Sequence, residues 1–323
     1  MLLIIDRPNE RDPLLWDLYS YLIANYDVHL SQRTSTDIQT IVKDEMYGKM
    51  PTRIYRGFSL GTSLELSIDY INENQIPVTV SIGDPNLFTT VHKYTKSLWA
   101  LDTIDSLILT WPDNGPDYYF DKRISDFQNK GYIAYDRTKA IYGDRTQTFL
   151  KRAKHIHTPW GFNPDHWRSP DKKKKRPIDI NMVCAIHRTY PKHENRRKVI
   201  GQLSKLDCRK QLGNLYGAYY RETLKQSKIF IVLTGTNFLT QKYLEGALSG
   251  CLLIGNIPTE PKNTFVDGET MVGLEDYDTV NEVVEYYLEH PQERKRMTRE
   301  CYDRVVKNYN IEVVTKELVE AIM

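Results

Sequence analysis

Short apolar runs alternate with longer amphipathic ones over the first half of the chain, and this pattern predicts strands separated by helices. A strand–helix rhythm of this kind indicates parallel strands covered by helices. The expected strands are Leu2–Asp6, Arg53–Arg56, Pro77–Ile82, Ser106–Thr110 and Tyr132–Tyr135. The expected helices include Leu14–Asn25, Leu60–Asn72 and Leu87–Trp99.

The rhythm breaks at Thr158–Pro164, and a polar stretch follows it. In that stretch two prolines, Pro170 and Pro177, frame the basic run Lys172–Arg176. This composition predicts a solvated linker or surface loop. We therefore expect an N-terminal domain over residues 1–168, a basic linker over 169–177 and a C-terminal domain over 178–323.

The strand–helix rhythm resumes after the linker, and three helices are expected to end the chain. The first begins near Asp278 or Thr279, both N-cap residue types, and the second begins after Pro291. The simplest architecture is α/β, with two Rossmann-like, doubly wound domains facing each other across a cleft. The expected strands are Ile180–Ile186, Ile229–Leu233 and Leu252–Ile254, and the helices are Glu194–Leu206, Tyr216–Gln226, Leu239–Leu248 and Ile311–Ile322.

Composition narrows the class of protein. A chain of 323 residues is too long for one ordinary hydrophobic core and suggests two domains. Lys and Arg total 44 against 42 Asp and Glu, which argues against a dedicated nucleic-acid binder. No run approaches the roughly 18 apolar residues of a membrane span, and the apolar N-terminus is too short for a signal peptide. With four widely spaced cysteines, the chain is expected to be cytoplasmic.

The strand Lys228–Leu233, the polar loop Thr234–Asn237 and the helix that follows them form a candidate anion site. Unpaired N–H groups and the helix dipole favour an anion at a helix N-terminus. Glu245 is expected about a turn and a half into this helix, within reach of whatever the loop holds. The segment therefore predicts an anion site with one carboxylate nearby.

Several motifs of other enzyme classes are missing. The chain has no phosphate-binding Gly-x-x-x-x-Gly-Lys-Ser/Thr loop and no Gly-x-Gly-x-x-Gly after its first strand. It also lacks His-Glu-x-x-His, Cys-x-x-Cys and the Gly-x-Ser-x-Gly elbow. Cys184 and His187 have a tempting spacing, but a strand would direct them to opposite faces. These absences disfavour ATPases, ordinary dinucleotide dehydrogenases, zinc sites and serine hydrolases.

Three segments in order, Lys242–Ile254, Phe265–Glu269 and Tyr286–Arg294, carry a family resemblance. Together they resemble the C-terminal domain of group-1-type glycosyltransferases, in particular the branch of spore-maturation glycosyltransferase-like proteins. The resemblance covers about residues 179–320. It implies the GT-B fold, two Rossmann-like domains of which the second holds most of the sugar nucleotide.

The resemblance implies a role for Glu245, which matches the second Glu of the family's Glu-x7-Glu motif. That residue binds the ribose hydroxyls, a task that suits the two acceptor oxygens of a carboxylate. The competing interpretation is an intrahelical partner for Lys242 or a surface Glu. The first Glu of the motif is replaced by Asn237, a catalytic candidate beside the donor sugar. This departure leaves the stereochemical outcome and the sugar open.

The diphosphate requires positive charge and N–H donors, because charge develops on the leaving phosphate. Gly235 and Thr236 can offer backbone N–H groups. The resemblance implies a phosphate-binding Arg after the first strand of the domain and a basic residue on the matching helix. A solvated surface charge is the alternative for each. The candidate cations are Arg188 and Lys242, with Arg196 and Arg197 as alternatives.

The acceptor and any general base are expected from the N-terminal domain. Asp84 ends a strong strand and faces the expected cleft, although it is equally suited to cap the next helix. His92 lies on that helix and is the other catalytic candidate, with a core or surface His as the alternative. Asp6 and Arg7 close the first strand and are further candidates.

The late segment Asp276-Tyr277-Asp278 resembles the Asp-x-Asp metal motif of GT-A enzymes. It precedes an obvious helix start at Thr279, so capping explains it better. The sequence therefore predicts a metal-independent transferase without a cofactor, acting on a nucleoside-diphosphate sugar and an acceptor hydroxyl of a glycan or another molecule. The alternatives are a sugar-nucleotide epimerase of the same fold and a non-catalytic binding or coat protein.

Overall fold

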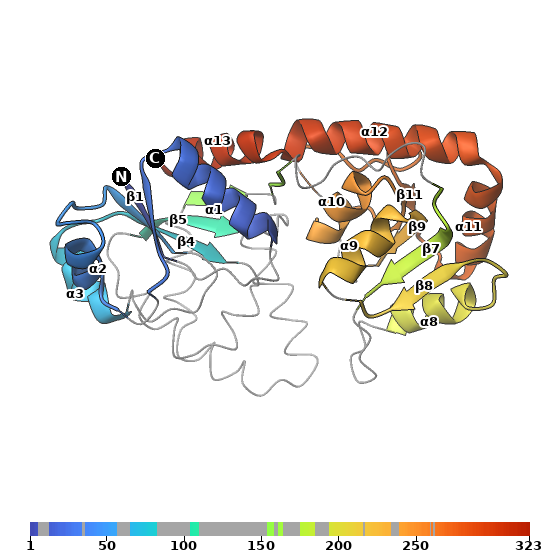
Figure 1. Ribbon diagram of the computed structural model, residues 1–323, viewed down its shortest axis with the longest axis horizontal. Helices are drawn as coiled ribbons and strands as arrows, with labels where there is room; N and C mark the ends of the chain where they lie inside the picture. Colours follow the sequence, from blue (N-terminus) through green and yellow to red (C-terminus); the bar gives the residue numbers. More distant parts are fainter. Residues whose placement is uncertain are drawn as a thin grey trace. The chain divides into compact units, whose positions relative to one another are not determined.

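The computed structural model describes the chain in two compact units. One comprises Met1–Gly161 with Val314–Met323, and the other Phe162–Val313. Both are α/β units built on wholly parallel sheets (Figure 1), which confirms the predicted fold class. The described residues are 1–5, 13–33, 36–56, 65–82, 104–109, 154–157, 161–163, 175–184, 194–215, 217–233, 239–258, 260 and 262–323.

The first unit contains a six-stranded sheet in the order β2-β1-β3-β4-β5-β6. Strand β1, which lies between β2 and β3, is apolar and buried at every position, as expected for a strand covered on both faces. The strands are β1 (Leu2–Ile5), β2 (Val28–Ser31), β3 (Arg53–Arg56), β4 (Val78–Ile82), β5 (Ile104–Leu109) and β6 (Lys154–His157). The described helices that precede residue 104 are α1 (Pro13–Asn25), α2 (Ile38–Asp44), the 3-10 turn η1 (Glu65–Ser67) and α3 (Ile68–Glu73).

Alternate residues of β1 pack against the helices α2 and α3. Leu3 and Ile5 belong to a cluster with residues of α2 and α3, such as Ile41 and Ile71. Asp37 caps α2 by accepting a hydrogen bond from the Thr40 amide at 2.7 Å. The period-2 alternation of the strand thus places Leu3 and Ile5 on the same face of the sheet.

The second unit contains a five-stranded sheet in the order β11-β10-β9-β7-β8. The strands are β7 (Ile178–Val183), β8 (Lys210–Gly213), β9 (Ser227–Val232), β10 (Leu252–Gly255) and β11 (Val272–Gly273). The helices are α8 (Glu194–Leu203), α9 (Gly217–Lys225), α10 (Gln241–Leu248), η3 (Tyr277–Thr279), α11 (Val280–Glu289), α12 (Pro291–Tyr309) and α13 (Ile311–Ile322), the last of which ends in the first unit.

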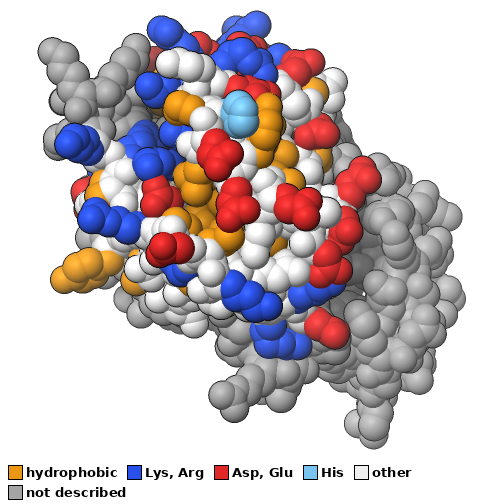
Figure 2. Space-filling view, turned by 90° about the vertical axis from the view of Figure 1, so that its right-hand side faces the viewer, with side chains coloured by type: hydrophobic (Ala, Val, Ile, Leu, Met, Phe, Trp, Pro, Cys, Tyr) orange, Lys and Arg blue, Asp and Glu red, His pale blue; other side chains and the backbone are white. Residues whose placement is uncertain are grey.

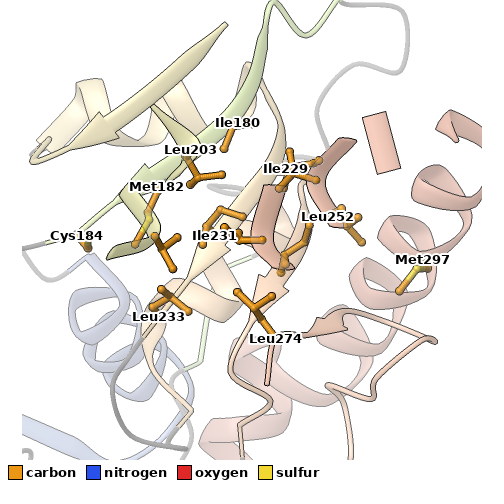
Figure 3. Packing of buried hydrophobic residues seen from close by; sticks show 14 residues of the cluster. Ile180, Met182, Cys184, Leu203, Ile229, Ile231, Leu233, Leu252, Leu274 and Met297 are labelled. Atoms are coloured by element: carbon orange, nitrogen blue, oxygen red, sulfur yellow. The ribbon is translucent and has the colours of Figure 1, made fainter. Parts of the chain in front are cut away.

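Two helical layers cover the two faces of the second sheet. On one face, Ile229, Ile231 and Leu252 pack with side chains of α8 and α11 in a single cluster (Figure 3). On the other face, Gly246 of α10 lies directly over Phe230 and Leu253. The strands are therefore buried on both sides, as their continuous apolar runs predict.

The long terminal helices follow their sequence periodicity. Pro291 occupies the start of α12, and Met297, Cys301 and Val305, spaced four residues apart in sequence, are fully buried on one stripe. Helix α13 has the predicted bounds, Ile311–Ile322. No helix in the described part of the chain is both long and apolar enough to cross a bilayer. All four cysteines are free thiols.

Four short strands were missed from sequence: β2, β6, β8 and β11. Strand β8 has the sequence Lys-Gln-Leu-Gly and β6 has Lys-His-Ile-His, so neither shows an apolar run. Such strands form because parallel neighbours supply their hydrogen bonds. The expected elements Leu87–Trp99 and Tyr132–Tyr135 lie outside the described residues.

The face of the second unit that carries α11 bears mixed charge (Figure 2). Acidic and basic side chains are interspersed there among apolar ones. One pair joins Lys198 of α8 to Asp278 of η3 at 2.6 Å. On this face the distribution does not resemble the clustered positive charge of a nucleic-acid-binding surface.

Candidate nucleotide site

The second sheet reverses its strand order between β7 and β9. From β7 the chain passes through α8 to the neighbour on one side, and from β9 it passes through α10 to the neighbour on the other. In doubly wound sheets, ligands bind outside the carboxyl ends of the strands at this switch point. The helices α8 and α10 both begin at this edge of the sheet.

Two basic side chains, one from each helix, reach across the switch point in opposite directions. Lys242 of α10 donates from Nζ to the carbonyl oxygen of Val183, the last residue of β7, at 2.6 Å. Arg196 of α8 donates from Nε to the carbonyl oxygen of Leu233, just after β9, at 2.8 Å. Each helix therefore reaches the end of the strand that precedes the other helix.

The ammonium of Lys242 and the guanidinium of Arg196 are both partly buried. Burial lowers the pKa of the Lys242 ammonium, and Arg196 lowers it further. Burial likewise lowers the pKa of the Arg196 guanidinium. At the end of β7, burial raises the pKa of the Cys184 thiol although Lys242 and Arg196 act on it in the opposite direction. An anion bound here would offset the cost of two neighbouring, partly desolvated cations.

The carboxylate of Glu245 is buried on the same helix as Lys242. Its side chain is on the inner side of α10, with 8% of the residue's surface exposed. Tyr220 of α9 donates from its hydroxyl to Glu245 Oε2 at 2.7 Å. Glu245 is thus not a surface glutamate, and its charge also acts on the Lys242 ammonium.

The N-terminus of α10 lies at the same edge of the sheet and lacks a side-chain cap. Thr240 is the N-cap, with an extended backbone, but its side chain makes no capping hydrogen bond. Among the described residues, its buried hydroxyl oxygen has no hydrogen-bond partner. A helix N-terminus that lacks a side-chain cap presents N–H donors to an incoming anion.

Helix α10 is fixed at both its middle and its end. An added Cβ at Gly246 would lie 2.6 Å from Phe230 and from Leu253, so only glycine permits this close approach to the sheet. At the C-terminal end, Arg176 donates to the carbonyl oxygens of Ser249 at 2.8 Å, Ser227 at 2.6 Å and Gly250. The predicted solvated linker is therefore wrong for Arg176, because its guanidinium satisfies two carbonyls that directly follow α10 and one at the start of β9.

Of the sequence-derived candidates, the structure brings Lys242, Arg196 and Glu245 to one edge of the sheet. Arg197 lies beside Arg196 on α8 and is partly exposed. The remaining candidates lie outside the described residues and stay predictions: Asp84, His92, Asp6, Arg7, Arg188, Gly235, Thr236 and Asn237.

In the Asp276-Tyr277-Asp278 segment, Asp276 caps the 3-10 turn η3, as the capping interpretation predicts, whereas Thr279 at the start of α11 makes no side-chain capping bond. The Asp276 carboxylate accepts from the Asp278 amide at 2.9 Å, and the Asp278 carboxylate accepts from Gln202 and Lys198. Within the described residues, no group of three or more His, Cys, Asp or Glu side chains is arranged to hold a metal ion. Metal independence stays a prediction.

Sequence reasoning did not identify Tyr220. Three tyrosines, Tyr216, Tyr219 and Tyr220, fall within about one helical turn, so their spacing does not show which one faces α10. The structure distinguishes the last two, because Tyr219 is 80% exposed whereas Tyr220 contacts Glu245.

The second half of the chain is similar to a known protein family. Residues 174–320, just under half of its length, match a family model described as glycosyl transferase-like. This segment is glycosyltransferase-like, as its ordered motifs predicted. No curated protein matches the chain in sequence.

Solved structures share the fold over nearly the whole chain. Sucrose-phosphate synthase from Thermosynechococcus elongatus has a TM-score of 0.59 at 11% identity, covering 99% of this chain and 97% of that one. HepE from Anabaena in complex with UDP has a TM-score of 0.57 at 10% identity, with 99% and 98% covered. A glycosyltransferase from Rickettsia africae has 0.54 at 12% identity, with 99% and 96% covered. This likeness confirms the GT-B fold.

Proposed function

We propose that the protein is a metal-independent glycosyltransferase whose second unit binds a nucleoside-diphosphate sugar. The observation that carries this proposal is the crossing of Lys242 and Arg196 at the switch point, with Glu245 on the same helix as Lys242. Two cations suit the diphosphate, and a buried carboxylate suits the vicinal hydroxyls of the ribose.

The arrangement also suits the chemistry of transfer. The bond between the anomeric carbon and the diphosphate oxygen breaks, and its electron pair remains on the diphosphate. The acceptor hydroxyl oxygen forms the new bond to the anomeric carbon and passes its proton to a general base, for which Asp84 and His92 are the sequence-derived candidates. Lys242 and Arg196 would stabilise the negative charge that develops on the leaving diphosphate. Because they stand in a partly dry site, each charge acts more strongly than it would in water.

UDP sugars are the first donors to test, since a structural neighbour, Anabaena HepE, was solved with UDP-glucose. Ligands that bind only the folded state raise the melting temperature, so a thermal-shift series with UDP, ADP and GDP identifies the base. The protein is then incubated with the matching nucleotide sugar, with and without EDTA. Release of nucleoside diphosphate in both conditions supports the proposal, an isomerised donor indicates an epimerase, and binding of no nucleotide contradicts both.

A further inference from the structure

Helix α9 contributes a side chain to the site that neither the sequence motifs nor the family match assigns. Tyr220 lies in the first half of α9, which packs against α10. Its hydroxyl donates to Glu245 Oε2 at 2.7 Å. The two residues are brought together only by the packing of the two helices, since they are far apart along the chain.

The Tyr220 hydroxyl is a permanent donor. Burial raises the pKa of the phenol well above its usual value, and the Glu245 carboxylate adds to this shift. The proton therefore stays on the phenol throughout the neutral and mildly alkaline range. A protonated phenol beside a carboxylate makes a charge-assisted hydrogen bond, which is shorter and stronger than a neutral one.

Such a bond sets the plane of the carboxylate. The last torsion of a glutamate side chain is broad, so its rotamer alone fixes the two oxygens poorly. Vicinal ribose hydroxyls require both oxygens in one orientation, because each hydroxyl must donate along a lone-pair direction. A rigid aromatic donor on a neighbouring helix supplies that constraint.

We infer that Tyr220 is a positioning residue that holds the Glu245 carboxylate in the orientation required by the nucleotide ribose. This inference rests on the proposed function. It predicts that Tyr220 acts only on ligands that carry ribose hydroxyls, whereas a purely structural hydrogen bond would act equally on all ligands.

The test compares UDP with 2′,3′-dideoxy-UDP by calorimetry in the full-length protein. The wild type should prefer UDP by about tenfold or more, the value of hydrogen bonds to a charged group. Tyr220→Phe should lose most of this preference while its dissociation constant for dideoxy-UDP stays within about twofold of wild type. Tyr219→Phe, a change at the exposed neighbour, should behave as wild type. Melting temperatures establish that each variant folds.

Glu245→Gln distinguishes the ribose role of Glu245 from the positioning role of Tyr220. If this variant and the wild type prefer UDP equally, the ribose role of Glu245 in the proposed function is wrong. If Glu245→Gln loses the preference but Tyr220→Phe keeps it, the proposed function stands and the positioning role is wrong. Equal weakening of both ligands in Tyr220→Phe also contradicts it, since that pattern reports general structural damage. A wild type that binds none of UDP, ADP and GDP overturns the inference together with the proposed function.

Discussion

Helices α8 and α10 begin at the same edge of the second sheet, yet they are built differently. Residues Tyr243–Leu248 of α10 are all buried, whereas α8 buries only Val199 and Leu203. Glu245 and Lys242 therefore stand on an element clamped against the sheet, while Arg196 extends from a largely exposed one. Sites on rigid elements hold their geometry more tightly. We expect α10 to fix the site and α8 to contribute mainly charge.

The largest expected effect comes from loosening the end of α10. Arg176→Ala removes the donor to three carbonyl oxygens and leaves them unsatisfied. The free energy of unfolding should fall by about 3 kcal/mol, as for other lost hydrogen bonds to a charged group. Urea denaturation measures this change. Lys175→Ala, at the exposed neighbouring position, is the control and should change it by less than about 0.5 kcal/mol.

A second variant pair tests the packing difference between the helices directly. Gly246→Ala forces a methyl group against Phe230 and Leu253 and should destabilise the protein by about 2 kcal/mol. Gly201→Ala in α8 meets no atom within 4 Å and should be neutral or stabilising by up to about 1 kcal/mol. Equal effects of the two substitutions on urea unfolding would show that α10 is no more tightly packed than α8.

The smallest stability effect concerns Lys242, whose pKa lies below its ordinary 10.5 because of burial. Between its lowered pKa and 10.5, the unfolded chain binds the proton that the folded chain has lost, so stability rises with pH. At neutral pH both states are charged and the full cost remains. Lys242→Met removes this cost but also the hydrogen bond to the Val183 carbonyl oxygen, so its free energy of unfolding at pH 7 should stay within about 1 kcal/mol of wild type. Relative to wild type, the stability of Lys242→Met should fall as the pH rises towards 10.5.

A control for this pH dependence is Lys295→Met, which replaces an exposed lysine of α12. Its difference from wild type should stay flat over the same pH range. A clear loss of stability in Lys242→Met at pH 7 would mean that the ammonium is held for structural reasons and not as a ligand for an anion.

The sequence predicted what repeats along the chain and missed what depends on contacts between distant segments. Helices α12 and α13 follow from their apolar periodicity, and Glu245 and Lys242 follow from an ordered series of motifs. Arg176 belongs to a basic run that resembles a solvated loop, and only the fold brings it beside Gly250. Tyr220 was missed for the same reason, since its partner lies on another helix.

The binding of a diphosphate by Lys242 and Arg196 is tested most simply by comparing UDP with uridine in wild type and Lys242→Met by calorimetry. Lys242→Met should weaken UDP binding by at least about tenfold, the loss typical of a charged hydrogen bond. Uridine, which carries no phosphate, should bind both proteins equally. An unchanged affinity of Lys242→Met for UDP would show that Lys242 does not bind the diphosphate.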